Sequence, residues 1–180
     1  LSTGSNNFRV ILGYAPQETA DDDDRESFFN ELELEIKNCE ETGDSPLVLG
    51  DFNARIEPSE ETPYGIPNSK NGRALHNILT EHDLPVMNFT DTCTGKWTHE
   101  VRTTGATSVI EYVAVDSILR EKITSMVIDD CALHCPFGVT KTAGETITTL
   151  SDHNPIMLQL TVPRYKSIPE RHSPTWLFKA

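Results

Sequence analysis

The sequence predicts a mixed α/β sandwich, in which β-sheets lie inside and helices lie outside. Segments with β-branched residues or strand-like alternation outnumber the segments whose apolar residues recur at helical spacing. The chain has 180 residues, of which 37% are hydrophobic, and this is enough to bury one sizeable core. A single domain over residues 1–162 is therefore expected.

The first elements form a strand–helix–strand unit. A strand is expected over residues 8–14, because its apolar residues lead to Pro16, which has no N–H for further pairing. The acidic run at 21–24 provides an N-cap and favourable charge for an amphipathic helix over residues 23–40. We interpret this run as a solvated helix start rather than a metal site. A buried strand at 46–50 follows.

A surface loop and a second helix come next. Residues 57–70 contain three prolines and a glycine, which is typical of a loop. Asn71 and Gly72 then open a shorter helix. Its inner face carries Ala74, Leu75, Ile78 and Leu79. Further strands are expected over residues 84–89, 95–99, 109–115, 124–129 and 155–162. Residues 163–180 contain three prolines and several basic residues, which predicts a linker leaving the domain.

Composition restricts the classes of function. A net charge of −13 repels nucleic acid in general, which counts against a simple nucleic-acid-binding module. It does not exclude an enzyme that meets phosphate through a metal ion and a few local donors. The four cysteines lack the spacing of a disulfide framework, which indicates an intracellular, reducing compartment. Without a run of 18 apolar residues, neither a membrane span nor a signal peptide is expected. Because the chain starts at Leu1 rather than Met, we expect it to be part of a longer protein.

Two polar clusters lie at the ends of predicted strands. The apolar strand in Leu47–Ala54 runs into Asp51 and Asn53, and alternate residues of a strand point the same way. Ser151-Asp152-His153 precedes the strand at 155–162. We expect the two clusters to form one composite site. The alternatives are an ordinary Asx turn in the first cluster and a capped turn in the second.

The residue types suit hydrolysis of a phosphoester. This reaction needs a divalent ion to hold charge, a base or orienter for water, and donors for the developing oxyanion. Asp51 can deprotonate or orient the water, and Asn53 can donate to a phosphoryl oxygen. Asp152 can bind a hard cation, and His153 can contact the phosphate.

These motifs resemble the endonuclease/exonuclease/phosphatase superfamily, and most closely the endonuclease domain of non-LTR (LINE-type) retrotransposons. The likeness also includes Tyr14-Ala15-Pro16, Asn71-Gly72, Lys96-Trp97-Thr98 and the segment 174–180, which is similar to the start of a linker toward a reverse transcriptase. The resemblance implies a four-layer α/β sandwich of the deoxyribonuclease I-like type, with mixed, mainly antiparallel sheets flanked by helices. This chain would be its C-terminal part.

The resemblance also implies roles for individual residues in Mg2+-dependent (or Mn2+-dependent) nicking of DNA. Asp51 would be the base or water orienter, Asn53 a transition-state donor, and His153 the contact to the scissile phosphate. Asp152 would be the metal ligand, and Glu111 would orient the imidazole of His153.

Three further residues are expected at the substrate. Tyr14 would face the phosphate, Trp97 would lie beside the site, and Arg102 in the hairpin segment 99–108 would contact a DNA phosphate. Simple packing is the alternative for Tyr14 and Trp97, and a solvated loop is the alternative for Arg102.

Two features depart from the family pattern. Glu111 stands where the family has aspartate, which adds roughly 1.5 Å of reach. The first half of the family's domain, including its main metal ligand, has no counterpart in this chain. We therefore expect the chain alone to be a poor or inactive nuclease. The missing sheet is also expected to leave apolar surface and strand edges uncovered, which favours self-association.

Three functions are compatible with the sequence. The leading one is the DNA endonuclease of a retrotransposon-type protein, which would work in the nucleus. The second is a phosphatase of the same fold that acts on an inositol phosphate or a phospholipid headgroup. The third is an inactive relic that only binds partners.

Overall fold

The computed structural model of the chain describes residues 7–101, 103–131, 140–142, 146–148 and 151–161. Arg102 and the linker predicted over 163–180 lie outside these residues. Among the described residues, no helix is long and apolar enough to cross a membrane.

The first sheet has the strand order β1-β2-β8 and consists of β1 (Phe8–Tyr14), β2 (Ser45–Asp51) and β8 (Glu111–Val115). β1 and β2 are parallel, whereas β8 is antiparallel to β2. The register places Tyr14 opposite Asp51 on one side, and Glu111 opposite Asp51 on the other. The sheet thereby brings three predicted site residues to one end.

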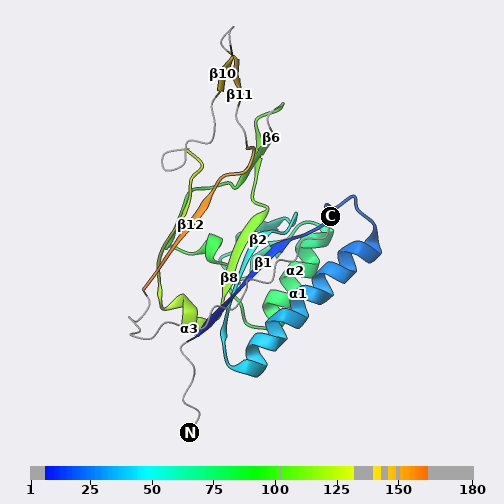
Figure 1. The fold of residues 1–180 in the computed structure, drawn as a ribbon, viewed down its shortest axis with the longest axis vertical. Coiled ribbons are helices and arrows are strands. Elements are labelled where there is room, and N and C mark those ends of the chain that lie inside the picture. Colours follow the sequence, from blue (N-terminus) through cyan, green and yellow to red (C-terminus); the bar gives the residue numbers. More distant parts are fainter. Residues whose placement is uncertain (1–6, 102, 132–139, 143–145, 149–150, 162–180) are drawn as a thin grey trace.

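Two helices cover one face of this sheet (Figure 1). They are α1 (Asp22–Thr42), which connects β1 to β2, and α2 (Lys70–Glu81). Asp21 caps α1 by accepting a hydrogen bond from the backbone N–H of Asp23, which confirms that the acidic run is a helix start. Between β2 and α2, the predicted loop contains a short antiparallel pair, β3 (Ile56–Glu57) and β4 (Ile66–Pro67).

A second sheet packs against the other face, with the order β12-β9-β5. Its strands are β12 (Ile156–Leu160), β9 (Ile123–Ile128) and β5 (Cys93–Thr94). The remaining elements are the 3-10 helix η1 (Met87–Phe89), the helix α3 (Ser117–Arg120), the hairpin β6 (His99–Val101) with β7 (Ala106–Ser108), and the hairpin β10 (Thr140–Thr142) with β11 (Thr146–Thr148).

Two predicted strands are wrong. In the segment 84–89, Val86 forms an isolated bridge to Ala114, and a 3-10 helix follows at once. In the segment 95–99, the chain leaves β5 at Gly95, where a φ of 92° breaks the extended conformation. A Cβ at Gly95 would lie 2.2 Å from the carbonyl oxygen of Ile128, so the turn needs glycine.

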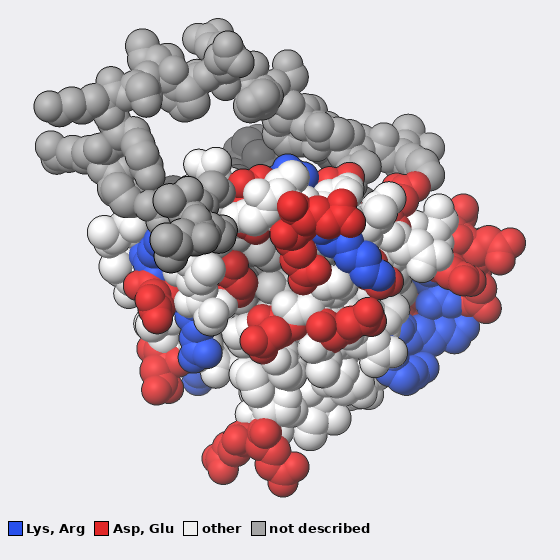
Figure 2. Space-filling model, turned by 90° about the horizontal axis from the view of Figure 1, so that it is seen from below, with Lys and Arg blue, Asp and Glu red and all other residues white. Residues whose placement is uncertain are grey.

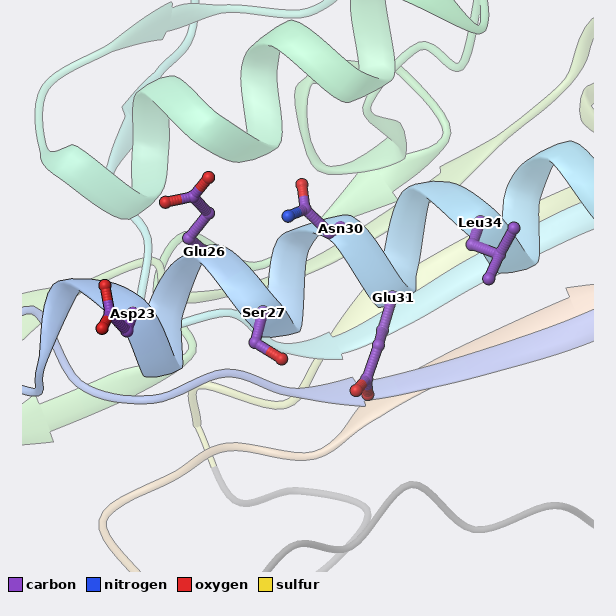
Figure 3. Close-up of a pocket in the computed structure, with 6 residues that line it drawn as sticks. All are labelled: Asp23, Glu26, Ser27, Asn30, Glu31 and Leu34. Atoms are coloured by element: carbon purple, nitrogen blue, oxygen red, sulfur yellow. The ribbon is translucent and has the colours of Figure 1, made fainter.

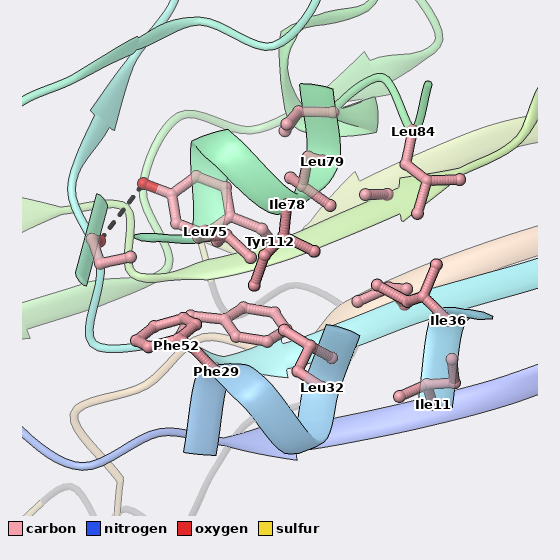
Figure 4. Close-up of a cluster of buried hydrophobic side chains, with 14 of the residues drawn as sticks. Ile11, Phe29, Leu32, Ile36, Phe52, Leu75, Ile78, Leu79, Leu84 and Tyr112 are labelled. Carbon is pink, nitrogen blue, oxygen red and sulfur yellow. Dashed lines mark hydrogen bonds between the residues drawn. The ribbon is translucent and has the colours of Figure 1, made fainter. Parts of the chain in front are cut away.

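The two faces of the first sheet support separate cores. On the helical side, Ile36, Phe52, Leu75 and Tyr112 are buried between sheet and helices (Figure 4). Complete burial of a large apolar side chain contributes about 1.5–3 kcal/mol. On the other side, the two sheets enclose a second cluster. Its buried members are Leu47, Met87, Val113, Val115, Leu119, Ile123, Met126 and Ile128.

The second sheet does not cover β1. Phe8, Val10, Leu12 and Tyr14 are 40%, 55%, 44% and 63% exposed. The register places Val10 opposite Leu47, so these side chains continue the face that the second sheet covers over β2. Uncovered apolar surface of this kind was expected from the sequence.

Candidate active site

The end of β2 positions Asp51 through a tight turn. The Asp51 carboxylate accepts a hydrogen bond of 2.8 Å from the backbone N–H of Asn53, and Asn53 has a φ of 44°. The expectation that Asp51 and Asn53 share a strand face is wrong, because β2 ends at Asp51 and an Asx turn follows. The Asn53 amide donates to the carbonyl of Ala15 at 2.8 Å, which joins the loops that follow β1 and β2.

Asn71 connects these two loops through hydrogen bonds of its side-chain amide. It is fully buried, and its side-chain amide lies 2.8 Å from the carbonyl oxygen of Pro16, 3.2 Å from that of Phe52 and 3.3 Å from that of Asn53. Its backbone N–H donates to Glu18 at 2.7 Å. From sequence, Asn71 was expected only at a helix start. In the structure it sets the backbone around Asp51.

Glu111 and His153 are joined by a hydrogen bond between the Glu111 Oε1 and the His153 Nδ1. The longer glutamate therefore reaches the imidazole. Thr98 supports Glu111, because its hydroxyl accepts from the backbone N–H of Glu111 at 3.3 Å and from that of Ile110 at 3.0 Å. The other Glu111 oxygen, Oε2, is buried and has no hydrogen-bond partner among the described residues.

The turn that contains His153 is hydrogen-bonded to the segment before β6. The Ser151 hydroxyl accepts from the His153 backbone N–H at 3.0 Å, as in the capped turn considered above. The Asn154 side chain donates to the Trp97 carbonyl at 3.0 Å, and the Asn154 backbone N–H donates to the Thr98 carbonyl at 2.6 Å. These bonds place His153 over the end of the first sheet.

Two overlapping clusters of potential ligand atoms result. Asp51, Glu111 and His153 each present one such atom within 4.8 Å of the others, and so do His99, Asp152 and His153. Asp152 lies 3.7 Å from the His153 Nε2 and 3.8 Å from the His99 Nε2. The distant motifs thus meet through Asp51, Asp152 and His153.

The charges of the site shift two pKa values. Burial, with a further contribution from Glu111, raises the pKa of Asp51 above its usual range. Burial acts against protonation of His153. The hydrogen bond that His153 donates to Glu111 and the negative charges of Glu111, Asp51 and Asp152 outweigh this effect and raise the pKa of His153. The imidazole is thereby biased toward its cationic form, which suits contact with an anion.

Two of the remaining predicted residues, Tyr14 and Trp97, lie near this centre. Tyr14 is 63% exposed at the end of β1, beside Asp51 in the register. Trp97 is half-buried, and its carbonyl holds Asn154. Arg102 lies outside the described residues. Sequence reasoning missed His99, which follows the Lys96-Trp97-Thr98 motif and whose ring centroid lies 4.9 Å from that of His153.

The described residues fit magnesium poorly. Magnesium prefers oxygen ligands in an octahedral shell. The ligand atoms beside Asp152 are imidazole nitrogens, and one Glu111 oxygen is already bonded to His153. Asp51 and Asp152 remain as carboxylate ligands, and phosphate and water would have to complete the shell, so we assign no chemical step to this ion.

A hollow along α1 is separate from the site. It is lined by Asp23, Glu26, Ser27, Asn30, Glu31 and Leu34, all from one helix (Figure 3). Several of its side chains are carboxylates, and they diverge rather than converge on a point. The hollow therefore lacks the arrangement of a binding site.

Solved structures share the fold of this chain. The Neisseria 3′ phosphatase NExo, bound to a product DNA hairpin, matches with a TM-score of 0.59 at 20% identity over 87% of this chain. The AP endonuclease of Archaeoglobus fulgidus matches with 0.56 at 16% identity over 85%. The endonuclease domain of TRAS1, a telomere-specific non-LTR retrotransposon, matches with 0.51 at 14% identity over 85%.

The chain spans 62%, 61% and 58% of the length of these three proteins. No family model matches the chain, and no curated protein matches its sequence. The structural matches confirm the predicted fold, a deoxyribonuclease I-like α/β sandwich. At these identities they establish the fold and not the activity.

Proposed function

We propose that this chain is part of a metal-dependent phosphodiesterase domain that nicks DNA, of the type found in non-LTR retrotransposons. The observation that carries the proposal is the meeting of Asp51, Glu111 and His153 at the end of the first sheet. The fold, shared with nucleases and a phosphatase, supports the same reaction class.

In this proposal, His153 contacts the scissile phosphate. The Nδ1 of His153 is hydrogen-bonded to Glu111, so Nε2 is the nitrogen that can donate to a phosphoryl oxygen. The raised pKa of His153 favours the cation that makes this a charge-assisted contact. Glu111 acts as a positioning residue, because it fixes the ring and does not itself reach the substrate.

Asp51 is the proposed base or orienter for the attacking water. Its raised pKa brings the carboxylate closer to the range in which a base works efficiently. The Asn53 amide, here bonded to Ala15, is the proposed donor to the transition state. Tyr14, Trp97 and Arg102 keep their proposed roles at the substrate. Asp152 is the proposed metal ligand of the whole domain.

DNA is the favoured substrate despite the net charge of −13. Figure 2 shows acidic side chains spread over one face of the molecule, with basic side chains in a few separate groups. A surface of this kind repels DNA in general, so binding must depend on local contacts at the site. The acidic surface, together with the poor fit to magnesium, supports the expectation that this chain alone is an impaired nuclease. The proposed location is intracellular, and nuclear if the domain serves a retrotransposon.

A nicking assay tests the proposal. The chain is incubated with supercoiled plasmid in Mg2+ or Mn2+, and conversion to open circles is compared with that of the variant His153→Ala. We expect slow nicking that the substitution reduces by roughly 100-fold or more, as for loss of general acid–base or electrostatic catalysis. His76→Ala, which removes a histidine from α2, is the matched control. Nicking that persists in His153→Ala contradicts the proposal.

A phosphatase acting on an inositol phosphate or phospholipid headgroup is the second candidate. It is favoured by the acidic surface and by the fold's occurrence in a 3′ phosphatase. Release of inorganic phosphate from an inositol phosphate without plasmid nicking would support it. Loss of both activities, with partner binding that His153→Ala leaves unchanged, would instead support the inactive relic.

A further inference from the structure

His99, Asp152 and His153 form a cluster that the proposed hydrolysis does not fully use. His99 lies at the start of β6, and the other two lie in the turn before β12. An isolated bridge pairs the backbones of His99 and His153, which places the two imidazoles side by side with Asp152 between their outer nitrogens.

Both imidazoles are oriented by a second hydrogen bond. The Nδ1 of His153 is bonded to Glu111, and the Nδ1 of His99 lies 3.3 Å from the hydroxyl oxygen of Ser108. In each ring this leaves Nε2 facing Asp152. A histidine that binds a metal through one nitrogen usually has its other nitrogen held in this way by a carboxylate or another polar group.

The distances are close to those of a tetrahedral zinc site. With bonds of about 2.0–2.2 Å, the ligand atoms of such a site lie roughly 3.3 Å apart. The His153 Nε2 lies 3.7 Å from the Asp152 Oδ1, and the His99 Nε2 lies 3.8 Å from the Asp152 Oδ2. One ligand atom from each of the three residues lies within 4.8 Å of the others, so shifts of roughly 0.5–1.5 Å would complete the site. Two imidazoles and one carboxylate suit zinc and other transition metals better than magnesium.

We propose that His99, Asp152 and His153 form a zinc-binding site whose fourth position is open to water or to an anion. The site holds zinc independently of whether the domain is a nuclease. One consequence rests on the proposed function. Zinc would bind the Nε2 of His153, which is the atom proposed to contact the scissile phosphate. Zinc would then inhibit the enzyme.

Calorimetric titration of Zn2+ into the 180-residue chain tests the site. The Cys131→Ser variant serves as the parent, because it removes an exposed thiol that competes for zinc. We expect one site, with affinity reduced at least about tenfold by His99→Ala and by Asp152→Asn. Ser108→Ala keeps all three ligands and is expected to weaken binding about tenfold through the orientation of His99.

Glu81→Gln is the control, because Glu81 belongs to a separate cluster with Glu33 and His82. Circular dichroism checks that each variant folds, and long-range ¹H–¹⁵N spectra show which imidazole nitrogens bind the ion. Unchanged zinc affinity in His99→Ala and Ser108→Ala would overturn the proposal. So would loss of the site in Cys131→Ser or Glu81→Gln.

Discussion

Tyr112 joins the end of β8 to the loop beyond Asp51, and removal of its hydroxyl gives a direct test of this architecture. The side chain is 1% exposed. Its oxygen accepts from the backbone N–H of Ile56 at 2.9 Å and donates to the carbonyl of Val109, also at 2.9 Å. Burial is the main cause that raises the pKa of Tyr112, so the phenol stays neutral and keeps its donor.

In Tyr112→Phe, the ring keeps its packing and two backbone groups lose a partner. A buried N–H without a partner costs about 1–3 kcal/mol, and Ile56 is only 4% exposed. Val109 is only half-buried, so the loss of the donor to its carbonyl should add at most about 1 kcal/mol. The expected loss in the free energy of unfolding is about 1–4 kcal/mol, a large share of a typical domain's stability.

Urea denaturation measures this loss. For a slope of about 1–3 kcal/mol per molar urea, the midpoint should fall by roughly 1 M. Tyr64→Phe is the matched control, since that half-buried hydroxyl bonds the exposed Asp83 at 2.6 Å, which raises the pKa of Tyr64 to about 12. We expect a much smaller shift there. Equal midpoints for Tyr112→Phe and the unmodified chain would refute the assigned role of the hydroxyl.

Three further predictions concern the site and the exposed strand. Glu111→Gln should lower the pKa of His153, as an NMR titration of the imidazole would show. The pKa of His153 is raised in the folded chain, so protonation of His153 stabilises the fold below about pH 6.5. This stabilisation disappears as pH rises through the pKa of the folded state, and the stability of the variant should not show this pH dependence. Asp51→Asn should stabilise the chain at pH 7, because burial raises the pKa of Asp51 and makes its ionisation unfavourable. The gain in urea midpoint should disappear below about pH 3.9, where the Asp51 carboxyl is protonated in both the folded and the unfolded chain. Val10→Lys should reduce self-association in sedimentation velocity, whereas Ile118→Lys, an equally exposed change on α3, should not. Oligomers that persist in Val10→Lys would exclude β1 as the contact.

The elements near the site were largely predictable because local patterns specify them. The apolar run before Asp51, the acidic N-cap of α1 and the alternation after His153 correspond to β2, α1 and β12. The strand predicted at 84–89 failed because apolar composition alone does not separate a strand from a bridge followed by a 3-10 helix.

Long-range partners could not be read from the sequence. Asn71 lies 18 residues from Asn53 and 55 from Pro16, and no local motif announces that its amide would bind both carbonyls. His99 was missed for the same reason, since its proximity to His153 arises from the pairing of two distant segments. The Asx turn at Asp51 was weighed from sequence, but only the φ of Asn53 decides between a turn and a continued strand.

Glu111 and His153 belong to different layers of the sandwich, since Glu111 opens β8 and His153 precedes β12. Their hydrogen bond consequently spans the seam between the two sheets. Movement of one sheet against the other would change the geometry of this bond. The chemical shift of the His153 Nδ1 proton should therefore report, in solution and without any substrate, whether the two sheets keep this contact.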